Sequence, residues 1–188
     1  MVSLGLGVGL AAACGLRVFL PVLALGLAAR LGAVALTPGF AWIATAPALL
    51  ALAAATLLEI AAFYIPWLDN ALDAIASPVA VLAGILVSAS VLIDVPPLLR
   101  WSVAIIAGGG AAAAVQASSV FLRLKSSALT GGFGNFILAT VEWVGAVVFT
   151  LLSILLPLTG FAVLLVALVI LVWRRRDPPR HPEGEGIA

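Results

Sequence analysis

Residues 136–156, FILATVEWVGAVVFTLLSILL, form an apolar run that contains a single charged side chain, Glu142. About 20 consecutive apolar residues are needed for a helix to cross the hydrocarbon core of a bilayer. The strands of a membrane barrel would instead alternate between apolar and polar residues, and this run does not. It therefore predicts a transmembrane α-helix.

The composition of the whole chain supports the same conclusion. Of its 188 residues, 64% are hydrophobic and 9% are charged, whereas soluble domains are about half apolar and a quarter charged. Most of the surface must therefore face lipid, and the backbone must satisfy its hydrogen bonds within helices. We expect an all-α integral membrane protein with six transmembrane segments, at residues 4–29, 47–65, 72–93, 98–122, 136–156 and 161–173.

Charge at the segment ends predicts the topology. Arg174–Arg176 follow the last segment and favour a cytoplasmic C-terminus, and an even number of spans returns the N-terminus to the same side. We therefore expect one transmembrane domain over residues 1–173 of a cell inner-membrane protein, with both termini cytoplasmic. The charged, proline-rich residues 174–188 are expected to be a disordered cytoplasmic tail.

The first and fourth segments are both interrupted, the first between Gly15 and Pro21 and the other between Arg123 and Gly134. We expect these two segments to be broken or re-entrant. In an alternative topology, residues 1–32 and 101–135 form re-entrant hairpins and four true spans remain.

An internal repeat is visible in the sequence. Residues 11–20 resemble residues 113–122, and residues 55–59 resemble residues 138–142. The repeats would cover residues 1–94 and 98–173, with three spans each. Because three is odd, the second repeat would be inverted relative to the first, as in many transporters. In the four-span alternative the two repeats are parallel.

The repeat ends on a glutamate in both copies, Glu59 and Glu142. A carboxylate facing lipid is costly, so Glu59 in the apolar run 51–62 must face protein or water. It either carries a proton or binds a cation, or else it joins two helices as a structural group. Glu142 lies nearer the start of its segment and either shares that role or stabilises the helix.

Arg17 follows Gly15 in the middle of the first segment. At that depth we expect it to pair with another group, and the repeat makes Glu59 its natural partner. Alternatively, Arg17 and an exposed helix N-terminus contact an anionic headgroup or phosphate.

Asp69 and Asp73 lie just before the third segment, four residues apart. One of Asp69 and Asn70 would cap the exposed amides of that segment. The two like charges on one helical face also leave room for a cation. Further on, the polar, glycine-rich residues 126–135 either line a cavity or form a cytoplasmic turn.

Several functions are excluded or disfavoured. The single histidine, His181, lies in the tail, so no haem, zinc or histidine-based catalytic site is expected within the bundle. A net charge of +1 indicates no nucleic-acid partner. We expect no cofactor, no metal and no enzymatic activity.

Several stretches resemble one bacterial membrane family, catalogued as domain of unknown function 4126. They are residues 15–21 (GLRVFLP), Leu58–Glu59, residues 65–73 (IPWLDNALD) and the glycine-rich residues 107–114. The resemblance covers about residues 4–173 and implies a multi-pass architecture with no established activity. Relatives tend to carry a lysine where this chain has Tyr64, and a second acid where it has Trp143.

The expected function is that of a small transporter or channel-like protein for a small solute, an ion or a lipid-linked anion. Glu59 would be the titratable group, Arg17 its partner or the anion contact, and Asp69 would lie at the cavity mouth. The competing hypothesis is a non-catalytic structural or assembly protein. Expected partners are membrane lipids, the transported molecule and a second copy of the chain.

Overall fold

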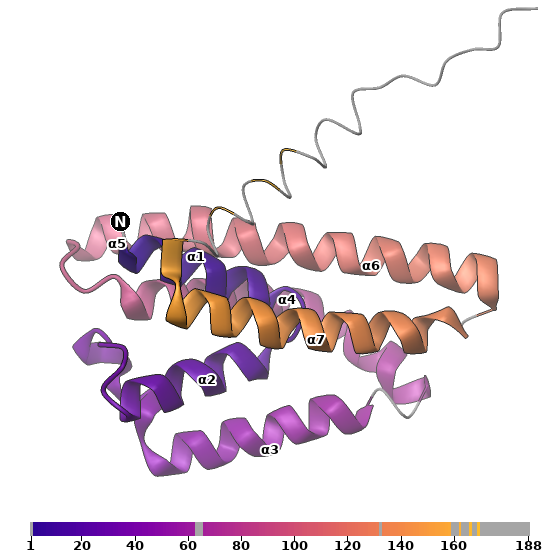
Figure 1. Cartoon of the computed structure of the whole chain (residues 1–188), viewed down its shortest axis with the longest axis horizontal. Coiled ribbons are helices and arrows are strands. Elements are labelled where there is room, and N and C mark those ends of the chain that lie inside the picture. Colours follow the sequence, from indigo (N-terminus) through magenta and orange to yellow (C-terminus); the bar gives the residue numbers. More distant parts are fainter. Residues whose placement is uncertain are drawn as a thin grey trace, which may run out of the picture.

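The computed structural model describes residues 2–62, 66–131 and 133–158 and the single positions 162, 166 and 169; from 66 to 75 it describes the backbone alone. Within these residues the chain is helical and contains no strand, which confirms the all-α fold class. Most of the sixth expected segment and the whole tail lie outside the described residues. The helices (Figure 1) are α1 (Val2–Cys14), α2 (Phe19–Arg30), η1 (Pro38–Ala44), α3 (Ala46–Ala62), α4 (Pro66–Val91), α5 (Pro97–Val103), η2 (Ala104–Gly109), α6 (Gly110–Thr130) and α7 (Gly134–Leu155).

Two helical stretches are long and apolar enough to cross a membrane. They are Pro97–Thr130, of 34 residues, and Gly134–Leu155, of 22 residues. The 3₁₀-helix η1 and α3 together form a third candidate, bent by 62°. The helices Val2–Cys14, Phe19–Arg30 and Ala76–Val91 are apolar but shorter. The described helices are thus compatible with a membrane protein, and by length and composition they supply two or three spans.

The fourth segment is interrupted within the predicted stretch, but seven residues after Arg123. Helices α5, η2 and α6 follow one another directly, and the helix passes through Arg123 to end at Thr130. No glycine or proline lies between Arg123 and Thr130 to stop it. Gly131 then adopts a left-handed conformation with φ +63°, which ends a helix readily because glycine has no Cβ.

The first segment is broken where the sequence predicted an interruption. Helix α1 ends at Cys14 and α2 begins at Phe19. Pro21 has no N–H and would remove a hydrogen bond from the interior of a continuous helix. Placed instead in the first turn of α2, it loses nothing, because amides there have no partner within the helix.

Helices α1 and α2 run in opposite directions and pack against each other (Figure 1). The first half of α1 and the residues that follow α2 both lie beside the C-terminal end of α4. The Ser88 hydroxyl donates to the Gly7 carbonyl at 3.0 Å, and the Thr37 amide, after α2, donates to the Ser90 carbonyl at 2.8 Å. We call this pair the α1–α2 hairpin and residues 15–18 its tip.

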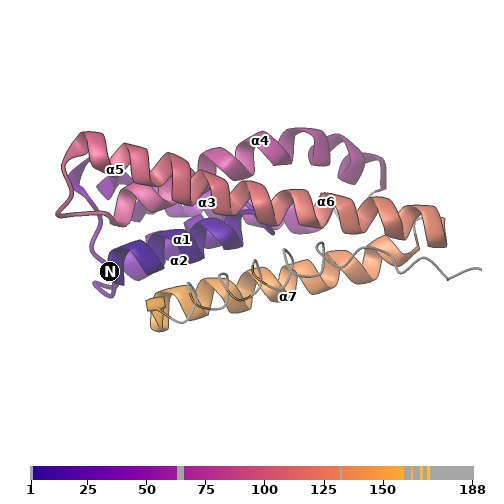
Figure 2. The same ribbon diagram turned by 90° about the horizontal axis from the view of Figure 1, so that it is seen from above.

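Helix α1 lies at the centre of the bundle, packed against α4, α6 and α7 (Figure 2). Every residue from Gly5 to Cys14 is buried, as expected of a helix that is apolar on all sides. Glycines allow the close approach: a Cβ at Gly5 would lie 2.6 Å from the Pro157 carbonyl oxygen, and one at Gly15 would lie 2.5 Å from that of Ala112. The tip is therefore held tightly against α6.

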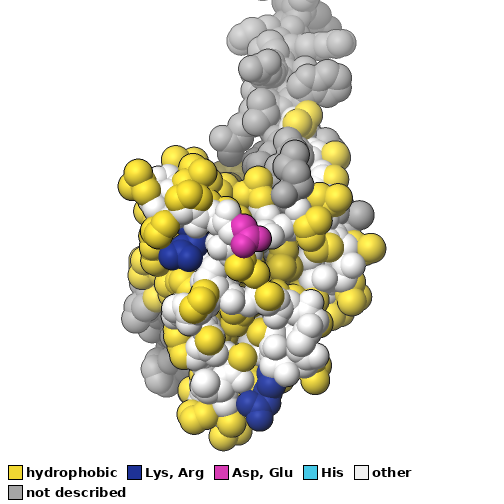
Figure 3. Space-filling model, turned by 90° about the vertical axis from the view of Figure 1, so that its left-hand side faces the viewer, with side chains coloured by type: hydrophobic (Ala, Val, Ile, Leu, Met, Phe, Trp, Pro, Cys, Tyr) yellow, Lys and Arg dark blue, Asp and Glu magenta, His cyan; other side chains and the backbone are white. Residues whose placement is uncertain are grey.

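One end of the bundle carries charges on a mainly hydrophobic surface (Figure 3). Arg30 is the last residue of α2 and Arg100 lies in α5, and both helices reach this end (Figure 1). The Arg30 guanidinium donates to the Ala44 carbonyl at 3.2 Å. Basic side chains next to apolar surface are typical of the boundary between a membrane and water.

Candidate functional site

Arg17 lies in the tip of the α1–α2 hairpin and points toward α7. Its Nη2 donates to the Ala139 carbonyl and to Glu142 Oε2, both at 3.1 Å. The sequence analysis gave Glu59 as the natural partner of Arg17; the ion pair described for Arg17 is with Glu142. The hairpin brings residues 125 positions apart into contact.

Glu142 accepts two more donors from α6. The Arg123 guanidinium makes a forked contact, with Nε 3.2 Å from Oε1 and Nη2 2.5 Å from Oε2. The Ser119 hydroxyl also donates to Oε1. We refer to Arg17, Ser119, Arg123 and Glu142 as the Glu142 cluster, which joins the hairpin tip, α6 and α7.

The Glu142 cluster is buried well inside the bundle. Arg17, Arg123 and Glu142 are 4%, 8% and 8% exposed. At 1.5 Å per residue, Glu142 lies about 12 Å from the start of α7 and about 20 Å from its end. Charges at such a depth must be hydrogen-bonded to one another, because a buried charge without a partner is strongly destabilising.

Glu59 stabilises the hairpin in a different way. Its two carboxylate oxygens accept the backbone amides of Val18 at 2.9 Å and Phe19 at 3.3 Å. These amides open α2 and have no acceptor within the helix. A negative charge is also favoured at a helix N-terminus. Half-buried Glu59, on α3, therefore caps the neighbouring helix.

Both glutamates of the sequence repeat thus meet the hairpin tip. Glu59 takes the amides that follow Arg17, and Glu142 takes the Arg17 guanidinium. The two glutamates lie on different helices, Glu59 on α3 and Glu142 on α7. Three of the charged groups predicted from the sequence, Arg17, Glu59 and Glu142, therefore meet at the tip.

Asp69 and Asp73 were also predicted as site residues, and their side chains lie outside the described residues. The backbone around them corrects one expectation. Helix α4 begins at Pro66, so positions 69 and 70 lie within the helix rather than before it. Proline is favoured at the first position of a helix, which explains the earlier start.

Two residues of the Glu142 cluster were not predicted. The sequence analysis named Arg123 only as the start of an interrupted stretch and gave Ser119 no role, whereas both are buried within α6. Their spacing in the sequence could have indicated a shared polar face, because Gln116, Ser119 and Arg123 follow one another at intervals of three and four residues. Polar residues at that spacing lie on one face of a helix. Gln116 donates to the Ser77 hydroxyl at 3.3 Å, so this polar face contacts α4 as well.

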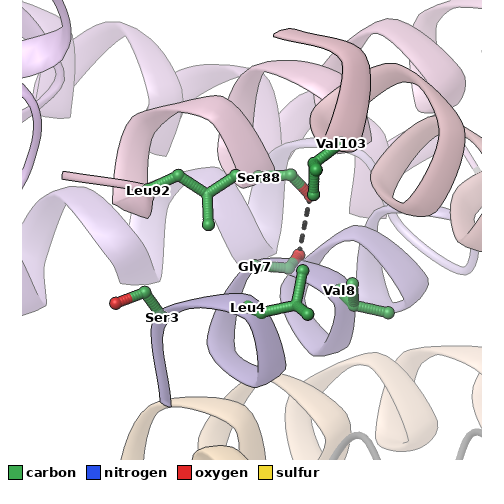
Figure 4. A pocket seen from close by; sticks show the side chains of 7 residues that line it. All are labelled: Ser3, Leu4, Gly7, Val8, Ser88, Leu92 and Val103. Atoms are coloured by element: carbon green, nitrogen blue, oxygen red, sulfur yellow. Dashed lines mark hydrogen bonds between the residues drawn. The ribbon is translucent and has the colours of Figure 1, made fainter. Parts of the chain in front are cut away.

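Other features of the bundle serve packing. A crevice between α1, α4 and α5 is lined by Ser3, Leu4, Gly7, Val8, Ser88, Leu92 and Val103, and the Ser88 hydroxyl crosses it to the Gly7 carbonyl (Figure 4). Among the residues for which coordinates are described, no three histidine, cysteine or carboxylate side chains lie close enough together to hold a metal ion. The Glu142 cluster is therefore the candidate functional site.

The fold and this site define an all-helical protein whose apolar helices suit a membrane and surround a buried cluster of charges. The chain belongs to the family described as Domain of unknown function (DUF4126), whose model matches residues 4–176. The resemblance noted in the sequence is confirmed by this match. No curated protein and no solved structure matches the chain.

Proposed function

We propose that this chain is a small transporter or channel-like protein of the cell inner membrane. It acts on a small solute, an ion or a lipid-linked anion, and it is not an enzyme. The observation that carries the proposal is the hairpin tip, where a helix break places Arg17 against Glu142 inside the bundle. Ionisable groups at membrane depth are expensive, and they are found along substrate and ion pathways.

The α1–α2 hairpin is proposed to be re-entrant. Its two arms start and end beside the C-terminal end of α4, so the first segment would enter the membrane and leave on the same side. Many transporters bind their substrate at the ends of such broken helices, near the middle of the membrane. The buried charges at the tip of this hairpin support such an arrangement.

A re-entrant first segment changes the proposed topology. The six expected segments would then cross the membrane five times, provided that residues 161–173 cross as their sequence predicts. With Arg174–Arg176 in the cytoplasm, the N-terminus would lie outside rather than inside. The first proposed repeat would then cross twice and the second three times. Their second and fifth segments would still be inverted, because α3 and α7 run in opposite directions (Figure 1).

The second candidate is a non-catalytic structural or assembly protein. It is favoured by the number of donors on Glu142, since Arg17, Ser119 and Arg123 all contact one carboxylate. Such a cluster would fix the hairpin, α6 and α7 in a single arrangement. Buried polar groups sometimes serve to specify one packing of helices.

Flux measurements on the reconstituted full chain separate the two candidates. Proteoliposomes would be loaded with sulfate or potassium, and transfer of a short-chain anionic phospholipid between leaflets would be measured in parallel. The proposal expects flux of at least one probe above protein-free liposomes, reduced by Glu142→Gln and unchanged by Lys125→Gln. Lys125 is an exposed cation two residues from Arg123 and serves as the control.

The absence of flux for every probe would count against transport. The structural candidate is then supported if Glu142→Gln lowers the thermal stability as much as Glu142→Leu does. A transport role predicts a smaller loss for Glu142→Gln, because the amide keeps the size of the side chain and one acceptor oxygen.

A further inference from the structure

Two arginines lie at the charged end of the bundle, and the fold uses them differently. The Arg30 guanidinium donates to the Ala44 carbonyl at 3.2 Å, so it joins the end of α2 to the end of η1. Arg100 on α5 is half-buried, and its Nε is shielded from solvent without a hydrogen-bond partner in the described part of the chain. A shielded donor costs free energy while it has no acceptor. Arg100 therefore does not make the kind of structural bond that Arg30 makes.

Arg100 lies at the level where a membrane helix meets the lipid headgroups. It belongs to the first turn of the continuous helical stretch Pro97–Thr130, which has 34 residues. At 1.5 Å per residue this stretch is about 51 Å long, whereas the hydrocarbon core of a bilayer is about 30 Å thick, so the ends extend into the headgroup layers. Exposed Trp42 and Trp101 at this end agree with that level, because tryptophan is enriched at the boundary.

We propose that Arg100 binds the phosphate of an anionic membrane phospholipid, in the leaflet at the N-terminal end of α1, which lies beside α5 (Figure 1). The planar guanidinium presents its N–H groups in a fork that suits phosphate oxygens. This inference does not depend on transport. Arg100 and Arg123 lie in one helical stretch, and their separation of 23 positions corresponds to about 35 Å, so the lipid site is distinct from the Glu142 cluster.

The surface around Arg100 is apolar, which favours a phosphate that carries acyl chains over a soluble anion. Its neighbours on α5, Leu98 and Leu99, are 84% and 54% exposed. Val103 lies three residues further along the same face of α5 and lines the crevice beside Leu92 (Figure 4). The acyl chains of a lipid held at Arg100 would therefore lie over apolar side chains.

The charges at this end favour an anionic headgroup over a zwitterionic one. Arg30 and Arg100 are both cations, and the connection between α4 and α5 carries one exposed carboxylate, Asp94. A zwitterionic headgroup would bring a further cation to this end, whereas phosphatidylglycerol brings none. A basic residue near the membrane surface attracts anionic lipid by about 1 kcal/mol, which corresponds to about a fivefold preference.

The first test is a titration of the full chain in neutral detergent, followed by native mass spectrometry. Short-chain phosphatidylglycerol and phosphatidylcholine would be added in parallel, and the wild type should bind the former about fivefold more tightly. Arg100→Gln should remove that preference. Two matched controls should keep it: Arg30→Gln, because Arg30 already has an acceptor, and Lys125→Gln, because Lys125 lies near the opposite end of α6.

A second measurement places the lipid beside α5. In a full chain whose only tryptophan is Trp101, with phenylalanine at the other four positions, fluorescence would be recorded in phosphatidylcholine liposomes. Phosphatidylglycerol or phosphatidylcholine brominated near the top of the acyl chains would be added at equal fractions. Phosphatidylglycerol should quench Trp101 more strongly, and Arg100→Gln should abolish the difference. Inorganic phosphate at constant ionic strength should not relieve the quenching.

Equal affinities of the wild type for the two lipids would overturn the proposal. So would a preference that survives in Arg100→Gln, or one that Arg30→Gln or Lys125→Gln lowers as much, because the effect would then belong to surface charge in general. A preference that inorganic phosphate removes would replace the lipid by a soluble anion. If Arg100→Gln does not fold, the chain with native Arg100 decides, and equal quenching of Trp101 by the two brominated lipids refutes the site.

Discussion

Replacing Glu59 tests whether a carboxylate from α3 holds the broken helix together. Glu59 accepts the amides of Val18 and Phe19 at 2.9 and 3.3 Å. Glu59→Leu keeps an apolar group of similar size and removes both acceptors. Glu59→Gln keeps one oxygen, but its amide nitrogen cannot accept the second hydrogen bond.

The size of the effect follows from the number of amides left without a partner. A buried backbone donor that loses its acceptor costs about 1–3 kcal/mol. Glu59→Leu leaves two such donors, which gives about 2–6 kcal/mol, and water at the half-buried site should hold the loss to the lower half of that range. Glu59→Gln leaves one donor and should lower the free energy of unfolding by about 1–2 kcal/mol.

The free energy of unfolding of both variants can be measured from the loss of the helical circular dichroism signal as denaturant is added in mixed micelles. Leu58→Ala is the matched control, because Leu58 precedes Glu59 on α3 and is 70% exposed. It should change the stability little. A Glu59→Leu protein as stable as the wild type would refute the capping role, and equal losses for Glu59→Leu and Glu59→Gln would show that the charge matters rather than the count of acceptors.

Three other outcomes are expected. Gly15→Ala should destabilise the protein by about 1–3 kcal/mol in the same unfolding assay, because its Cβ would meet the backbone of α6. The control Gly110→Ala, whose Cβ would meet nothing within 4 Å, should stabilise the protein by about 0.5–1 kcal/mol. Equal effects of the two substitutions would refute the close approach. Cys14 is buried and should react with a maleimide only after unfolding, so fast labelling of the folded protein would contradict its place in the core. Reporter fusions should place the N-terminus outside and Arg174–Arg176 inside, and a cytoplasmic signal from both ends would restore six crossings.

The hydrophobic pattern alone predicts the fold class and most helix positions, because continuous apolar runs can satisfy their backbone in lipid only as helices. It also predicts a break near Gly15 and Pro21, since proline cannot continue a helix without losing a hydrogen bond. It placed the interruption of the fourth segment between Arg123 and Gly134, and α6 ends inside that stretch, at Thr130. The helix continues through Arg123, which is buried, because no glycine or proline lies before Gly131 to end it.

The partners of the buried charges were decided by the tertiary structure. Sequence order and the internal repeat pointed from Arg17 to Glu59, yet the return of α2 alongside α1 turns Arg17 toward α7 and leaves the α2 amides to Glu59. Ser119 and Arg123 join the cluster because α6 continues past Leu122 and presents that face to Glu142. The sequence determines which residues are too costly to expose to lipid; the path of the chain through the bundle determines which of them meet, because hydrogen bonds form only between groups about 3 Å apart.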